Sequence, residues 1–142
     1  MKKAILPIVL ALIILIAGCS KDATSTTDYS SAWVGIYTNS LNPSAGLNHV
    51  VISRTGTNTL QVLLQQDTAS HIGTVATLTN VTVVNASTIV LNENSTLEGI
   101  TDSTFQFVAS GALNGNTLIL SGSATNTAAP RDVKNFYFTG SK

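Results

Sequence analysis

Cysteine, charge and aromatic side chains are scarce in this sequence, and each shortage excludes a class of structure or activity. The only cysteine is Cys19, so the chain can form no internal disulfide and no site built from several thiolates. Charged residues make up 10% of the chain, with five basic and seven acidic side chains after residue 18. Such sparse and balanced charge lacks the basic stripe of a nucleic-acid-binding surface, so we expect no nucleic-acid partner.

Sequence motifs of common enzymes and metal sites are also missing. There is no Gly-x-Ser-x-Gly elbow, no glycine-rich phosphate loop and no His-Glu-x-x-His. The two histidines, His49 and His71, have no carboxylate at metal-ligand spacing. Glu93 and Glu98 could supply the carboxylate pair of a glycosidase, but they flank a predicted turn and are more simply solvated. We therefore expect no enzyme activity, no bound metal and no cofactor.

The one long apolar run lies at the start of the chain. Lys2 and Lys3 precede an almost unbroken apolar stretch from Ala4 to Ile16, and small residues follow it up to Cys19. This basic, apolar and small-residue order is that of a secretory signal peptide. Residues 4–18 are fewer than the roughly twenty that a membrane-spanning helix needs. We therefore predict that residues 1–18 are a cleaved signal.

The end of this run resembles the lipobox of bacterial lipoproteins, through the sequence Leu15-Ile16-Ala17-Gly18-Cys19. The resemblance implies that the Cys19 thiol receives a diacylglyceryl group, that the preceding peptide bond is cut, and that the new amine is acylated, for example with palmitate. Because each buried methylene group contributes about 0.8 kcal/mol, two or more acyl chains anchor a protein stably. The resemblance thus makes Cys19 a membrane anchor, and its covalent lipid is the only added group expected.

Residues 19–31 are polar and small and show no periodicity, so we interpret them as a flexible tether. The opening Ser20-Lys21-Asp22 resembles the start of Gram-negative lipoproteins that reach the outer face of the outer membrane. Ser20 beside the cysteine is also similar to the sorting pattern of outer-membrane lipoproteins. These resemblances imply a lipid-anchored protein of the outer membrane, on its periplasmic face or at the cell surface.

From residue 32 to residue 142 the pattern predicts a single all-β domain. Short alternating apolar runs are separated by Gly and Asn turns, and no apolar pattern of helical period extends beyond a turn or two. We expect about eight antiparallel strands, the first over Trp33–Tyr37, in a meander that closes into a small barrel or a strongly curved sheet. A β-sandwich is the alternative, because Leu63, Val108 and Ile119 put apolar side chains on the nominally outer face. These three could instead form an interaction patch.

Two features of register follow from the apolar alternation. Residues 50–52 and 60–64 share one face only if an odd number of residues links them, so we expect a loop of three or five residues containing Gly56. The long strand over residues 73–84 changes phase midway, which predicts a β-bulge near residues 79–80. We also expect turns at residues 85–87 and 92–95, an irregular piece at 97–100 and a last strand over 133–139.

The most distinct hairpin pattern covers residues 104–125. Asn114-Gly115 lies between two alternating runs and predicts a type I′ turn, which pairs Leu113 with Asn116. Pairing outward from there sets a large side chain against a small one four times: Gly111 with Leu118, Ala109 with Leu120, Phe107 with Gly122, and Phe105 with Ala124.

The β domain resembles small lipocalin-like bacterial lipoproteins over residues 32–139, through Trp33-x-Gly35-x-Tyr37 near its start and the hairpin around residues 110–118. The resemblance implies a barrel that carries a small apolar ligand. An eight-stranded barrel is just wide enough for its own side chains or for one small ligand. The aromatic residues expected to line such a site are Trp33, Tyr37, Phe105, Phe107, Phe136 and Phe138. The alternative is a structural or interaction module with a fully packed core, whose protein partner the sequence does not identify.

Overall fold

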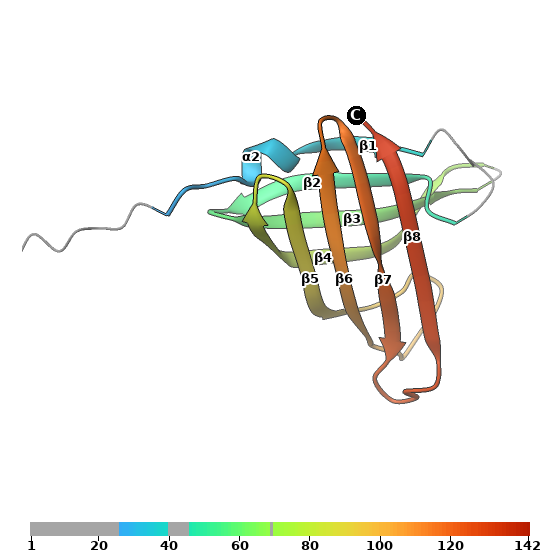
Figure 1. Ribbon diagram of the computed structural model, residues 1–142. Helices are drawn as coiled ribbons and strands as arrows, with labels where there is room; N and C mark the ends of the chain where they lie inside the picture. The colour runs from blue at the N-terminus through green and yellow to red at the C-terminus, as the bar shows by residue number, and fades with distance from the viewer. Residues whose placement is uncertain (1–25, 40–45, 69) are drawn as a thin grey trace, which may run out of the picture.

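The computed structural model describes residues 26–39, 46–68 and 70–142, whose regular structure is eight β-strands and one short helix. The strands are antiparallel and close into one barrel, in which each strand pairs with the next along the chain and β8 returns to β1 (Figure 1). The elements are α2 (Ser30–Trp33), β1 (Gly35–Thr38), β2 (His49–Gly56), β3 (Thr59–Asp67), β4 (Ile72–Asn85), β5 (Thr88–Ser95), β6 (Phe105–Asn114), β7 (Thr117–Asn126) and β8 (Val133–Ser141). The predicted eight-stranded meander is confirmed as a closed barrel, and the sandwich is excluded.

The two ends of the barrel differ in how the strands are joined. At the end that we call the closed end, two-residue turns join β2 to β3, β4 to β5 and β6 to β7. The short helix α2 also lies at this end (Figure 1). Trp33 Nε1 donates to Asn85 O at 3.2 Å and Tyr29 N donates to Asn58 Oδ1 at 2.8 Å, which ties α2 to two of the turns. At the other, open end the links are longer and cover residues 39–48, 68–71, 96–104 and 127–132.

Inward side chains from all eight strands form the core. Along β6, for example, every second residue from Phe105 to Gly111 is buried and those between are exposed, as expected for a strand with one face inward. Burying a large apolar side chain stabilises a fold by about 1.5–3 kcal/mol. The largest buried side chains are Trp33, Tyr37, Phe105, Phe107, Phe138, Ile52, Leu60, Leu64, Leu78, Ile89, Leu91 and Leu118.

The ordered domain begins before residue 32. The Oδ1 atom of Asp28 accepts hydrogen bonds from the Ser30 amide at 3.0 Å, the Ser30 hydroxyl at 2.5 Å and the Asn58 amide at 3.0 Å, while Oδ2 pairs with Arg54 at 2.6 Å. The last residues of the predicted tether are thus held on the β2–β3 hairpin. Trp33 also differs from expectation, because it ends α2 instead of starting the first strand.

The β2–β3 hairpin has the predicted parity. Ile52 lies opposite Val62, so the two apolar rows share the inner face. The predicted loop of three or five residues containing Gly56 is wrong, because the turn has only two residues, Thr57 and Asn58, and Gly56 ends β2. The register shifts at Thr55, which has no partner on β3. A two-residue turn and one bulge residue together supply the odd number that the alternation requires.

β4 contains the predicted bulge, because its pairing with β3 shifts by one residue between Leu78 and Val81. The burial pattern of the strand changes phase at the same place. The unpaired amides of Thr79 and Asn80 donate to the carboxylate of Glu93 on β5, at 2.5 and 2.9 Å. Glu93 therefore satisfies the backbone groups that the bulge releases from the sheet.

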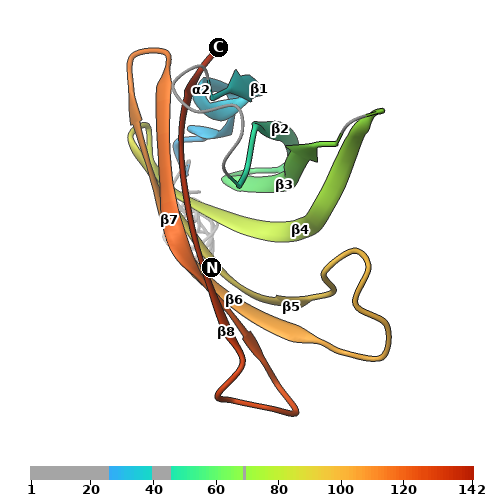
Figure 2. The same ribbon diagram turned by 90° about the vertical axis from the view of Figure 1, so that its right-hand side faces the viewer.

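Beyond the bulge, β4 turns away from β5. Their pairing covers only residues 82–85 of β4 and 88–90 of β5, and Figure 2 shows the two strands diverging toward the open end. The Ser95 hydroxyl donates to Thr77 O at 2.7 Å, and the Glu98 amide donates to Val75 O at 2.9 Å. The link between β5 and β6 thus attaches to β4 where the direct ladder is interrupted. The turn expected at 92–95 is wrong, since β5 continues through Ser95, whereas the irregular piece at 97–100 is confirmed.

The turn between β6 and β7 lies one residue later than predicted. Its central residues are Gly115 and Asn116, and only Gly115 has a positive φ, of 58°, which is the pattern of a type II′ turn. The four predicted pairs are therefore wrong by two residues. Both turn positions keep the same side chains inward, so the alternation does not distinguish them. The observed inward pairs are Leu113 with Leu118, Gly111 with Leu120, Ala109 with Gly122, Phe107 with Ala124, and Phe105 with Asn126.

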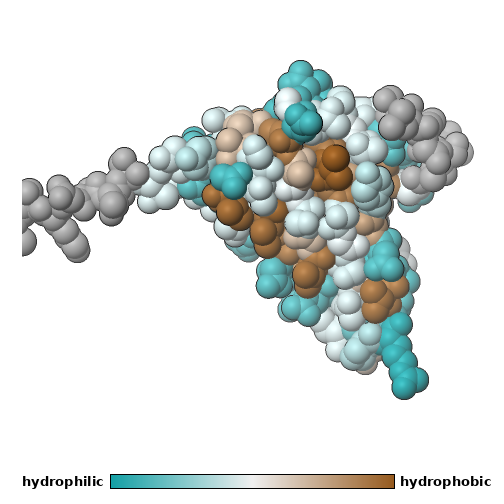
Figure 3. Space-filling view, viewed as in Figure 1, coloured by the Kyte–Doolittle hydropathy of each residue, from teal (hydrophilic) through white to brown (hydrophobic). Residues whose placement is uncertain are grey.

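The three outward apolar residues do not form one patch. Leu63 lies half-buried on β3, whereas Val108 on β6 and Ile119 on β7 are 51% and 40% exposed. Adjacent strands are about 4.8 Å apart, so β3 and β6 are separated by roughly 14 Å around the barrel wall. On the face in Figure 3, apolar side chains are interspersed with polar ones. A common interaction surface of these three residues is therefore not supported.

Candidate functional site

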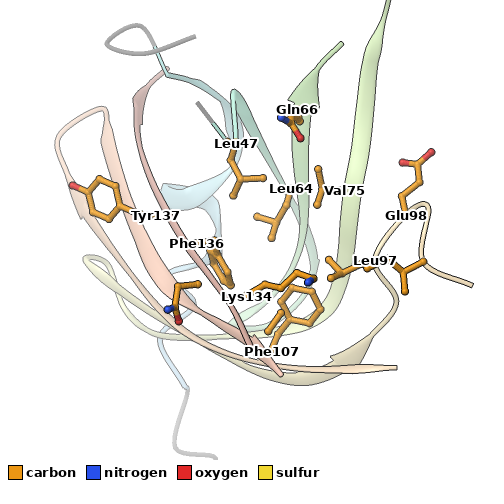
Figure 4. A pocket seen from close by; sticks show the side chains of 14 residues that line it. Leu47, Leu64, Gln66, Val75, Leu97, Glu98, Phe107, Lys134, Phe136 and Tyr137 are labelled. Atoms are coloured by element: carbon orange, nitrogen blue, oxygen red, sulfur yellow. The ribbon is translucent and has the colours of Figure 1, made fainter. Parts of the chain in front are cut away.

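A cavity of about 370 Å³ lies at the open end of the barrel. Its walls come from the β1–β2 link, β3, β4, the β5–β6 link, β6, β7 and β8. This volume falls in the range of small-molecule sites, which begins at about 300 Å³. Apolar side chains surround its centre, as Figure 4 shows, and they are Leu47, Leu64, Val75, Leu97, Phe107 and Phe136.

The cavity lies where β7 presents small side chains to the interior. Toward the closed end the inward residues of β7 are Leu118 and Leu120, but toward the open end they are Gly122 and Ala124. Ala124 pairs with Phe107 on one side, and the methyl group leaves the space beside that ring unfilled. Of these two small residues, Ala124 borders the cavity, whereas Gly122 is in close contact with β6.

Two of the six aromatic residues predicted to line a ligand site border the cavity. The rings of Phe107 and Phe136 lie 6.2 Å apart between centroids, with their planes tilted by 52°. Tilted pairs at this separation are favourable for aromatic rings. The other four are completely buried and line no part of the cavity: Trp33, Tyr37, Phe105 and Phe138.

Tyr37 belongs to the packing of the closed end. Its hydroxyl donates to Trp33 O at 2.8 Å, and burial raises the pKa of Tyr37 to about 12 because the phenolate would lose its hydration. The ammonium of Lys142 lies 5.2 Å from the centroid of its ring and donates to Ala32 O and Val34 O. These contacts join the end of the chain to α2 beside the short β1–β8 seam.

Sequence patterns missed the part of the cavity wall that lies outside the strands. Leu47 and Leu97 are only 7% and 8% exposed, and Ile100 packs against the core from the same β5–β6 link as Leu97. The sequence showed only that these residues are apolar and lie in segments without alternation. That does not identify the strand against which each of them packs.

Charged groups stand at the edge of the cavity. Lys134 pairs with Asp132 at 2.9 Å, and this hydrogen bond lowers the pKa of the Asp132 carboxyl. Glu98 directs its carboxylate away from the apolar side chains (Figure 4). Within the described residues, the Glu98 carboxylate has no hydrogen-bond or ion-pair partner.

A second hollow of about 260 Å³ adjoins the cavity, and we call it the polar groove. It shares Gln66, Val75 and Glu98 with the cavity. The rest of its wall comes from the β3–β4 link and the start of β4, and consists of Thr68, His71, Gly73 and Thr74.

Thr38, His49 and Asp67 form a hydroxyl–imidazole–carboxylate line on the outside of the barrel. The Thr38 hydroxyl lies 3.2 Å from His49 Nδ1, and His49 Nε2 lies 3.1 Å from Asp67 Oδ1. This order resembles a nucleophile, base and orienting acid. None of the three lines the cavity or the groove, and we assign them the role of tying β1, β2 and β3 together. The sequence spacing did not identify Asp67 as the partner of His49, because the two residues are 18 positions apart.

Glu93 is bound to the β4 bulge, so it does not pair with Glu98 as a two-carboxylate site would require. Within residues 26–39, 46–68 and 70–142, no three His, Cys, Asp or Glu side chains lie together in a way that could hold a metal ion.

The predicted signal peptide and the lipid attachment site at Cys19 lie outside the described residues. In the part of the chain that is described, no helix is both long and apolar enough to cross a membrane. Comparison with protein-family models, with curated protein sequences and with solved structures gives no match for this chain.

Proposed function

We propose that the protein is a lipid-anchored, non-enzymatic binding module of the outer membrane, whose barrel holds a small apolar ligand in the open-end cavity. The cavity of about 370 Å³ with its apolar wall is the observation that carries this proposal. A closed eight-stranded barrel is consistent with a lipocalin-like fold, in which the ligand enters at one end. No metal or cofactor is needed for such binding.

The packing of the barrel restricts a ligand to this one region. The interior of an eight-stranded barrel has room for its own side chains or for one small ligand. At the closed end Leu120 stands between Gly111 and Phe138, so that half is filled. An apolar molecule bound beside Phe107 and Phe136 would be removed from water without displacing the core.

The point where the chain enters the barrel supports an orientation for the anchored protein. Asp28 holds the entering chain at the closed end, opposite the cavity. Residues 19–27 span at most about 30 Å when extended. A lipid on Cys19 would therefore hold the closed end within this distance of the membrane, and the cavity lies at the other end of the barrel.

Anchoring is tested by changing Cys19 to Ala. The lipidated protein stays with membranes after a carbonate wash, whereas Cys19→Ala gives unprocessed or soluble protein. Retention of the processed variant in the washed membranes would disprove the lipid anchor. Digestion of the barrel by protease added to intact cells would identify the cell surface, and its protection would identify the periplasmic face.

Ligand binding is tested by filling the cavity from its wall. Val75 is half-buried and borders the cavity, so Val75→Phe directs a larger ring into it. Val84→Phe is the matched control, because Val84 lies on the same strand but is 54% exposed on the outer side. We expect binding of the neutral dye N-phenylnaphthylamine to fall at least tenfold in Val75→Phe and to be unchanged in Val84→Phe.

The alternative role as an interaction module makes the opposite prediction. Tyr137, Val108 and Ile119 are exposed on β8, β6 and β7, by 63%, 51% and 40%. Under this alternative, the wild-type chain binds no dye, and Ile119→Lys abolishes association of the protein with itself or with a partner. Wild-type dye binding that is lost in Val75→Phe excludes it as the main role.

A further inference from the structure

The polar groove and the apolar cavity lie side by side. Gln66, Val75 and Glu98 belong to the walls of both. A molecule whose apolar chain lies beside Phe107 and Phe136 can therefore place its other end in the groove. Such a molecule is amphipathic, with a single chain and a compact polar head.

The charges at the junction favour one kind of head. Lys134 would attract an anion, but its ammonium is already paired with Asp132 at 2.9 Å. Glu98 lies on the wall common to both hollows, is exposed, and has no partner for its carboxylate within the described residues. One neutralised pair and one unpaired carboxylate leave a net negative charge where the head would lie.

The hydrogen-bonding groups of the groove act in the same direction. The Thr68 hydroxyl already donates to His71 O at 2.7 Å. The carboxylate oxygens of Glu98 accept hydrogen bonds and donate none, whereas the Gln66 amide can accept or donate and so fits either kind of head. A head that donates hydrogen bonds and carries positive charge is satisfied by this set of side chains.

We propose that the ligand of the cavity is a cationic single-chain amphiphile, whose ammonium head lies in the polar groove against Glu98. This inference rests on the proposed ligand-binding function and specifies its ligand class. The head of an amine or of a quaternary ammonium supplies the same charge, and only the amine donates hydrogen bonds.

The test compares ligands that share one chain and differ in the head. The ligands are decylamine, decyltrimethylammonium, decanol and decanoate. Each is titrated against N-phenylnaphthylamine bound to the full chain held in lipid nanodiscs, with empty nanodiscs as the blank. All titrations are made at the same pH, 8. Because an ion pair at an exposed carboxylate is modest, we expect decylamine to bind about fivefold more tightly than decanol, and decanoate to bind least.

Glu98→Gln removes the charge and keeps the size of the side chain. We expect this variant to bind decylamine and decanol equally, with unchanged affinity for decanol. Asp102→Asn is the matched control, since Asp102 lies in the same β5–β6 link but lines neither hollow, and it should keep the fivefold preference. Lys134→Gln frees Asp132 and should increase the preference for the amine.

The outcomes distinguish a failure of this inference from a failure of the proposed ligand-binding function. If decanol displaces the dye but decanoate binds as well as decylamine, or if Glu98→Gln keeps the preference, the cationic head is wrong and the apolar site stands. If no ligand displaces the dye and the dye itself does not bind, the proposed function is wrong. Equal binding of decylamine and decyltrimethylammonium would show that the site recognises the positive charge of the head. Weaker binding of the quaternary head would show that it recognises the hydrogen bonds that the amine donates.

Discussion

Asp28 is the residue that attaches the first described segment of the chain to the barrel. Its carboxylate accepts hydrogen bonds from the side chain and backbone of Ser30 and from the backbone of Asn58, and these contacts, with Arg54 nearby, hold its pKa well below the usual range. A carboxyl group with a lowered pKa stabilises the fold above the unfolded pKa of about 4, and this contribution is lost as the pH falls below that value.

This linkage predicts a pH-dependent effect of Asp28→Asn. At pH 7 the variant should melt at a lower temperature than the wild type, because it loses the charged acceptor. As the pH falls from about 5 to about 2, the difference should shrink, since the wild type loses the same stabilisation. Thermal unfolding followed by circular dichroism measures both curves, with Asp102→Asn as a variant that should track the wild type. A difference that stays constant with pH would contradict this account of Asp28.

Two glycines on neighbouring strands should respond differently to the same methyl group. A Cβ at Gly122 would overlap the Cβ of Ala109 and the carbonyl oxygen of Val108, and backbone does not move aside easily. A Cβ at Gly111 would lie 2.6 Å from Cγ1 of Ile89, which is a side chain and not backbone.

We therefore expect Gly122→Ala to lower the free energy of unfolding by about 2–3 kcal/mol, as overpacking does. Gly111→Ala should cost less than Gly122→Ala, because the Cβ at Gly111 meets side chains and not backbone. Urea unfolding of both variants tests this order. Equal losses would mean that the sheet between β6 and β7 is more adaptable than its contacts indicate.

The bulge is the element that bends β4 away from β5. Glu93→Ala would leave the amides of Thr79 and Asn80 without their carboxylate, although water can reach them because both residues are exposed. We expect a loss of about 1–2 kcal/mol in the free energy of unfolding, with faster hydrogen exchange at those two amides. Glu98→Ala is the control, since its carboxylate has no partner in the described residues and its removal should leave stability unchanged. Unchanged exchange in Glu93→Ala would refute this role.

At the scale of strands and turns, the sequence was sufficient to predict the features that depend on only two strands. The parity of the β2–β3 hairpin and the position of the β4 bulge both follow from apolar alternation, because a slip of one residue would expose an apolar row. The β6–β7 turn could not be predicted in the same way. Asn114-Gly115 and Gly115-Asn116 are both favourable turn pairs, and moving from one to the other keeps every side chain on its face.

The candidate site was less predictable, because a cavity depends on where large side chains are absent from the barrel interior. Phe107 and Phe136 could be named from alternation, since both point inward from long strands. The same reasoning named Trp33, which the chain places on α2 at the closed end. Leu97 and Ile100 come from a link without periodicity, and the partner of Glu93 is a bulge backbone that no spacing rule identifies.

For the whole molecule, the central feature is a barrel with one packed end and one hollow end. Two-residue turns, α2 and the large residues of β7 occupy the first, whereas longer links and small residues of β7 leave the second open. The described chain enters at the packed end, so the proposed anchor and the proposed binding site belong to opposite ends of the barrel.

The most direct test of this account is to map a bound apolar ligand by nuclear magnetic resonance. Decanol is titrated into the full chain, and the shifts of aromatic and methyl groups are followed. The account predicts saturable changes at Phe107, Phe136 and Val75, and none at the indole of Trp33, the one tryptophan in the chain. Changes centred on Trp33 and Tyr37, or no saturable change anywhere, would contradict it.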